Sequence, residues 1–181
     1  MKNETGFTLI EVLVVTVLAA ILLTLSAGAI RHFWFVRSLD GGANQVVTQM
    51  RELQEDARSE TSPVVYGAWF NVGTDEYLIV KYNPDSPNVC EVAGTRSFDA
   101  GVRIQSASFV PDPISEDADD LTTNCMDESV IPGTADQATE FVYFFASGRA
   151  KEGTVVLEQP RLDGRTRTIS VSPITGRVEQ S

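Results

Sequence analysis

The chain has 181 residues, of which 43% are apolar, and a formal net charge of −11 at neutral pH. This excess of acid disfavours general binding to nucleic acid, because the phosphate backbone is also negative. The length is enough for one soluble domain of ordinary size, besides one apolar segment. Two cysteines without a C-x-x-C spacing and a single histidine also argue against a metal cluster.

The segment from residue 7 to residue 30 is almost entirely apolar and carries one charge, that of Glu11. About 20 apolar residues in a helix, at ~1.5 Å rise each, cross the hydrocarbon core of a bilayer. A helix pairs its own backbone groups, so we predict a membrane-spanning helix over residues 7–30. Glu11 is the unusual feature, because an ionisable group in a membrane is costly and usually has a partner.

The run Gly6–Glu11, GFTLIE in one-letter code, precedes and opens this apolar segment. It resembles the processing motif of type IV pilins and pseudopilins. The resemblance implies that a prepilin peptidase removes the leader, residues 1–6, by cutting after Gly6, and that the new N-terminal Phe7 is N-methylated. It further implies a filament subunit anchored in the cytoplasmic (inner) membrane with its head outside, which then joins other pilin subunits in a pilus or pseudopilus.

Glu11 has a physical role to play in such a filament. After cleavage, the α-amino group of Phe7 would be a cation beside an apolar helix, where a charge without a partner is strongly disfavoured. The Glu11 carboxylate of a neighbouring subunit could pair with that amine. Such a pair mainly penalises the wrong register. Glu11 is therefore predicted to set the axial position of the subunit.

Two other interpretations of the N-terminus stay open. One is a plain membrane anchor that keeps Met1. The other is a secretory signal peptide, because the Ala-Gly-Ala run at 27–29 fits a small-residue cleavage pattern and residues 12–25 fit its apolar region. Against the signal peptide, the leader has only Lys2 as a cation, offset by Glu4 and Glu11. The three interpretations differ in where the mature chain begins.

Over residues 31–60 the helix is predicted to continue outside the membrane with one apolar stripe that should lie on a sheet. The stripe consists of Val36, Leu39, Ala43, Val46, Val47, Met50, Leu53 and Ala57. Asp40-Gly41-Gly42 interrupts it, and each Gly costs about 1 kcal/mol in a helix relative to Ala. Residues 40–42 are therefore either a break between two helices or a bend. Pro63 is expected to end the helix, and His32 is interpreted as an interfacial residue.

Residues 61–181 are predicted to form an antiparallel β head, which makes the fold class α+β, with a long helix packed on an antiparallel sheet or sandwich. The expected strands cover residues 64–72, 77–82, 89–92, 102–110, 140–145, 154–159 and 165–172, with 177–178 as a last edge. The apolar run Phe141–Phe145 suits a strand buried on both faces.

Residues 111–137 form an acidic, turn-rich stretch that is long for a loop in a compact domain. Cys125 lies in this stretch, and in an extracytoplasmic head it would form one disulfide with Cys90. The carboxylates of the loop do not follow the spacing of an EF-hand. We therefore expect a solvated loop, with no bound metal and no cofactor.

The C-terminal part has a second, weaker resemblance, to the GspH/FimT family of minor pseudopilins and pilins. It rests on residues 145–149 (FASGR) and on the strand and turn of residues 169–178 (ISVSPITGRV). The acidic insertion with two cysteines is not expected in that family. The resemblance implies a minor subunit with a structural role, and no set of residues for catalysis is visible, so an enzyme is not predicted.

The run Gly164-Arg165-Thr166-Arg167 resembles a Gly-Arg-x-Arg motif of DNA-uptake minor pilins of the FimT kind. Alternation along a strand places Arg165 and Arg167 on one face, and Arg161 could extend the patch. A few guanidinium groups on phosphates would bind DNA weakly and without sequence preference. The alternatives are an ordinary strand edge guarded by charge and, for the whole chain, a secreted or anchored β domain unrelated to pili.

Overall fold

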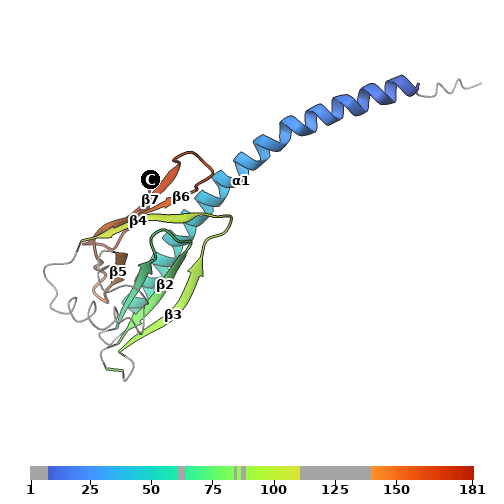
Figure 1. Cartoon of the computed structure of the whole chain (residues 1–181). Coiled ribbons are helices and arrows are strands. Elements are labelled where there is room, and N and C mark those ends of the chain that lie inside the picture. The colour runs from blue at the N-terminus through green and yellow to red at the C-terminus, as the bar shows by residue number, and fades with distance from the viewer. Residues whose placement is uncertain (1–7, 61–63, 84, 87–88, 111–139) are drawn as a thin grey trace, which may run out of the picture.

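The structure is a computed structural model, and it describes residues 8–60, 64–83, 85–86, 89–110 and 140–181. The described residues contain one helix, α1 (Leu9–Ser59), and its first half projects away from the strands (Figure 1). The strands are β1 (Val65–Phe70), β2 (Glu76–Tyr82), β3 (Cys90–Ser97), β4 (Arg103–Phe109), β5 (Phe141–Phe144), β6 (Gly153–Glu158), β7 (Thr166–Val171) and β8 (Val178–Gln180).

The strands form two antiparallel sheets of four strands each. The first sheet has the order β3-β2-β1-β5 and the second has the order β4-β6-β7-β8. Strand β5 follows β4 in the chain but pairs with β1 of the first sheet. The predicted α+β class, with a helix on antiparallel strands, is confirmed.

The main core lies between the second half of α1 and both sheets. From Leu39 onward every predicted member of the helix stripe is buried, whereas Val36, nearer the membrane segment, is only half-buried. The stripe packs with Phe70 of the first sheet and with Leu157 and Ile169 of the second. One face of one helix therefore holds the two sheets together, and burying that apolar area is the main favourable contribution to folding.

Strand β5 of the first sheet is buried on both of its faces, as the apolar run Phe141–Phe145 predicts. Val142 and Phe144 of β5 belong to the main core, while Phe141 and Tyr143 point to the opposite face. There they join a second apolar cluster, which also contains Val65, Trp69, Val80 and Tyr82. All four residues of β5 are buried.

Strand β3 extends to Ser97, whereas the sequence predicts a strand only over residues 89–92. Its second half is recognisable by its backbone pairing with β2 and not by its side chains. It pairs with β2 from Cys90 opposite Tyr82 to Ser97 opposite Glu76, with a bulge opposite Ile79 and Val80. Most of its side chains are exposed. It is an edge strand, so hydrophobic alternation gave no signal for its second half.

Helix α1 is unbroken across Gly41 and Gly42, where the sequence left a break or a bend open. A Cβ added at Gly42 would lie 3.4 Å from the side chains of Phe98 and Val102, whereas one added at Gly41 would meet nothing within 4 Å. Gly42 thus lets the connection between β3 and β4 lie close to the helix. Packing against the head outweighs the low helix propensity of the two glycines.

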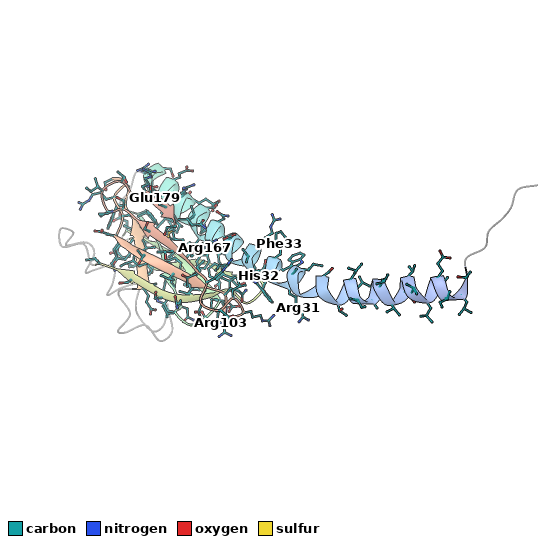
Figure 2. All side chains as sticks on the ribbon, turned by 90° about the horizontal axis from the view of Figure 1, so that it is seen from above. Arg31, His32, Phe33, Arg103, Arg167 and Glu179 are labelled. Carbon is teal, nitrogen blue, oxygen red and sulfur yellow. The ribbon has the colours of Figure 1, made fainter. Side chains whose placement is uncertain are left out.

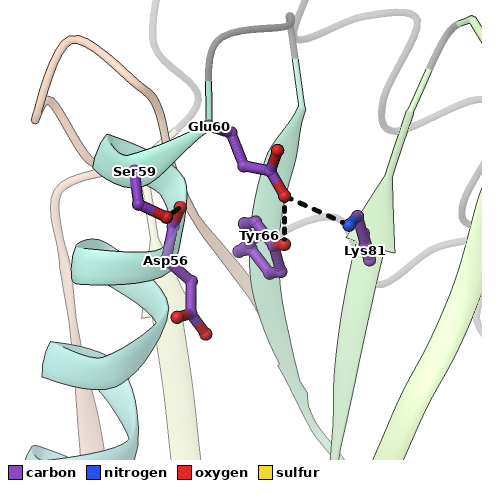
Figure 3. Close-up of polar contacts among 5 residues, drawn as sticks. All are labelled: Asp56, Ser59, Glu60, Tyr66 and Lys81. Carbon is purple, nitrogen blue, oxygen red and sulfur yellow. Dashed lines mark hydrogen bonds and ion pairs between the residues drawn. The ribbon is translucent and has the colours of Figure 1, made fainter.

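The far end of α1 is fixed to the first sheet through Glu60. Its carboxylate accepts a hydrogen bond from the Tyr66 hydroxyl (2.9 Å) and pairs with Lys81 Nζ (3.3 Å), as Figure 3 shows. The hydrogen bond from Tyr66, together with Lys81, lowers the pKa of Glu60 below its ordinary value. Glu60, the residue that follows the last helical turn, therefore attaches the end of α1 to Tyr66 of β1 and Lys81 of β2.

The turn between β7 and β8 holds the last turns of α1 from the side of the second sheet. Gln54 Nε2 donates to the carbonyl oxygen of Thr175 (2.7 Å), and Arg51 donates to that of Val178 (3.2 Å). Gly176, with φ +61°, contacts the Gln54 side chain, and its added Cβ would lie 2.9 Å from the carbonyl oxygen of Gly148. Gly148 and Gly176 both belong to the segments that resemble the GspH/FimT family, and they lie close together beside the end of the helix.

The glycine pair in α1 predicts opposite effects for matched substitutions. Gly41→Ala should raise the free energy of unfolding by about 1 kcal/mol, because it gains helix propensity without a new contact. Gly42→Leu should lower it by about 1–3 kcal/mol through overpacking against the head, whereas Gly41→Leu should not. Urea unfolding of the detergent-solubilised chain measures all three. Equal effects of Leu at both positions would contradict the assigned packing of Gly42.

The approach of Gly176 to Gly148 predicts a second difference. Gly164 also has a positive φ, +79°, but an added Cβ there would meet nothing within 4 Å. Gly164→Ala should therefore lower the free energy of unfolding by about 1–2 kcal/mol, the conformational cost alone. Gly176→Ala should lower it by about 1–3 kcal/mol more, because a methyl group must displace backbone. If both variants unfold at the same urea concentration, the close approach does not constrain the head.

Candidate functional site

The first half of α1 is an apolar rod without a partner in the described structure. The large apolar side chains that the structure describes between Leu9 and Leu23, and that of Ile30, are about half exposed or more, reaching 85% at Leu9 and 72% at Leu23. By length and composition this helix is able to cross a membrane. An apolar surface of this extent needs either lipid or other apolar helices to cover it.

The helix begins immediately after the predicted cleavage site, with Thr8 as its N-cap. The Thr8 side chain accepts a hydrogen bond from the backbone N–H of Glu11 (3.3 Å), which satisfies one of the free donors of the first turn. Gly6 and Phe7 themselves lie outside the described residues. The cap places Glu11 in the first turn, where the helix dipole favours a negative charge.

Glu11 is the one ionisable residue between Thr8 and Ile30. Within the described residues, its carboxylate makes no hydrogen bond or ion pair, and it lies on the exposed surface of the rod. The hydroxyl groups of the rod are different, because each donates to a carbonyl of its own helix: Thr16 to Leu13, Thr24 to Ile21 and Ser26 to Leu22. Glu11 is therefore the polar group of the rod that needs a partner from another molecule.

The three arginines of the predicted DNA patch have different surroundings. Arg167 pairs with Asp40 of α1, at 2.7 Å from Nη2 and 2.8 Å from Nε to the same carboxylate oxygen. Arg161 lies over the ring of Phe35, with its guanidinium carbon 5.1 Å from the ring centroid. Arg165 is exposed in the turn before β7. The structure thus uses two of the three to attach this end of the second sheet to the helix.

The predicted disulfide has one end in the described structure. Cys90 begins β3 beside the second apolar cluster, and its disulfide with Cys125 stays a prediction. Cys125 and the acidic loop lie outside the described residues. Among the residues that the structure does describe, no group of His, Cys, Asp and Glu side chains is arranged to hold a metal ion.

Lys151 is a feature that sequence reasoning did not find. It is buried, with its Nζ 5.1 Å from the centroid of the Tyr143 ring. Burial lowers the pKa of Lys151 to about 8. A lysine in a short connection between strands is ordinarily exposed, so composition and spacing carried no signal for it.

Comparison with protein families finds the prokaryotic N-terminal methylation motif at residues 1–27. No curated protein matches the chain by sequence. Among solved structures, the type IV minor pilin FimU of Pseudomonas aeruginosa matches with a TM-score of 0.50 and 15% identity, covering 80% of this chain and 89% of FimU. The minor pseudopilin EpsH from the type II secretion system of Vibrio cholerae matches with a TM-score of 0.51 and 12% identity, covering 80% of this chain and 93% of EpsH.

These matches concern the N-terminal motif and the fold. The chain carries the N-terminal methylation motif on an apolar helix, and that helix packs on antiparallel sheets in the way of the two solved structures. The chain is similar in fold to a minor pilin and a minor pseudopilin and carries the N-terminal motif, so the resemblance predicted from the sequence is confirmed. A structural role for this chain, rather than an enzymatic one, stays a prediction.

Proposed function

We propose that the chain is a minor pilin or pseudopilin that a prepilin peptidase cuts after Gly6 and that is then N-methylated at Phe7. It is anchored in the cytoplasmic membrane by residues 7–30, with the head outside, and from there it enters a type IV pilus or a type II secretion pseudopilus. The methylation motif and the helix-on-sheet architecture support this function.

The observation that carries the proposal is the position of Glu11 on an otherwise apolar rod. A carboxylate in the first turn of such a helix is tolerated when a cation meets it. Cleavage after Gly6 would create one, the amine of Phe7, on every copy of the chain. Pairing of Glu11 with the Phe7 amine of a neighbouring subunit satisfies both charges, and it selects one axial position because any other leaves two charges unpaired.

The proposal predicts where the mature chain begins. Intact mass of protein extracted from membranes should match a chain that starts at Phe7 and carries one added methyl group. A start at Met1 would indicate a plain anchor, and a start at Ile30 would indicate a signal peptide cut after the small residues at 27–29. Either of these two masses contradicts the proposal.

Glu11 predicts a second result, at the level of assembly. Glu11→Ala should abolish or strongly reduce incorporation into filaments, because the Phe7 amine of the neighbour then has no partner, while the protein still accumulates in the membrane. Glu4→Ala is the matched control, since Glu4 leaves with the leader and its loss should not affect incorporation. Immunoblotting of sheared filaments and of membranes measures both. Normal incorporation of Glu11→Ala would remove the assigned role.

DNA uptake is the alternative function, and Arg165, Arg161 and Arg167 are its candidate residues. It has less support, because the guanidinium group of Arg167 is engaged with Asp40. Salt-dependent binding of duplex DNA by the chain, weakened by Arg165→Ala together with Arg167→Ala, would support it. The absence of such binding leaves the structural role alone.

A further inference from the structure

At the end of the head from which the apolar rod emerges, the turn between β6 and β7, residues 159–165, is attached to α1. Gln159 Nε2 donates to Ser38 Oγ (3.2 Å) and to the carbonyl oxygen of Ala100 (2.9 Å). Arg161 lies over the ring of Phe35. The turn is therefore held at the height of helix residues 35–38.

That height corresponds to the lipid headgroups if the rod spans a membrane. The apolar segment ends at Ile30, and Phe35 lies five residues further, about 7.5 Å along the helix. The headgroup layer on each side of a bilayer is roughly 5–8 Å thick, from the difference between the total thickness and the hydrocarbon core. Phe33 and Trp34 are 57% and 68% exposed in this interval, as aromatic residues at a membrane interface are.

The same level carries four exposed arginines, which we call the basic collar: Arg31, Arg37, Arg161 and Arg165. Figure 2 shows Arg31, His32 and Phe33 where α1 enters the head. The acidic residues nearby are Asp99 and Asp163, which leaves an excess of two positive charges, four minus two. Asp40 does not reduce this excess, because Arg167 neutralises it. Arg103 is not counted in the collar, since Glu158 lies opposite it in the strand pair.

We propose that the basic collar docks the head onto anionic phospholipid headgroups while the subunit is in the membrane. This inference rests on the membrane anchoring of the proposed function and adds a partner to it, the lipid surface. A chain with a net charge of −11 would otherwise be repelled by an anionic membrane. The collar turns this locally basic end of the head toward that surface, so it orients the head before assembly.

The test uses the full-length chain in vesicles of phosphatidylcholine alone and in vesicles with about one-third phosphatidylglycerol, a level that gives a negative surface potential. Hydrogen exchange of the amides of residues 159–165 reports docking. Quenching of Trp34 by brominated lipid reports insertion of the rod. Trp69 lies in the second apolar cluster of the head, 5% exposed, so it contributes a constant background.

Phosphatidylglycerol should slow exchange of these amides severalfold at low salt, and high salt should reverse the effect. Arg161→Gln together with Arg165→Gln should abolish most of the protection. Each arginine near an anionic surface raises the binding constant for that surface roughly fivefold. The control, Arg96→Gln together with Arg177→Gln, removes the same charge from exposed positions outside the collar and should keep the protection.

Three results would overturn the inference. Equal exchange in the two lipids, with Trp34 quenched in both, would show an inserted chain without a docked head. Equal loss of protection in the collar variant and in the control variant would reduce the effect to net charge. Protection that rises with protein density in phosphatidylcholine alone would mean that a second copy of the chain covers the collar. Absence of Trp34 quenching, by contrast, would contradict the proposed membrane anchoring itself.

Discussion

The packing of one helix face against two sheets is the constraint on which the structure depends. Neither sheet is large enough to bury its apolar side alone, and the stripe from Leu39 to Ala57 supplies the shared surface. Because this stripe occupies only the second half of α1, the first half is left without any cover from the same chain. The fold therefore creates its own requirement for a membrane or for neighbouring helices.

The contacts that fix the helix lie at three heights along the head. Near the rod, Gly42 lies close to the connection between β3 and β4. The turn between β7 and β8 bonds to the last helical turns, and Glu60 attaches the end of the helix to the first sheet. These contacts attach the second half of α1 to the head, so the helix and the head keep one relative position. A register set at Glu11 would then set the position of the entire subunit.

Electrostatics along the molecule follow the same axis. The lone carboxylate lies at the beginning of the rod and the basic collar lies where the rod meets the head, whereas the acidic residues of the chain are concentrated before Arg149. Arg167 and Arg161 attach the second sheet to α1 through Asp40 and Phe35. The collar as a whole presents positive charge outward. Sequence reasoning grouped Arg161, Arg165 and Arg167 as one patch because it had no view of Asp40 and Phe35.

The sequence by itself determined the features that depend on local pattern: the apolar rod with Glu11, the amphipathic continuation, the strands with alternating or continuous apolar runs, and the resemblance to pilins and pseudopilins. Only the tertiary structure decided the features that depend on contacts between distant segments. In the folded chain α1 continues without a break through residues 40–42, and β3 extends to Ser97. The strands divide into two sheets, and Lys151 is buried. The physical reason is that helix propensity and hydrophobic period act over a few residues, whereas a glycine beside Phe98, a carboxylate beside Arg167 and a backbone edge beside β2 are brought together only when the chain has folded.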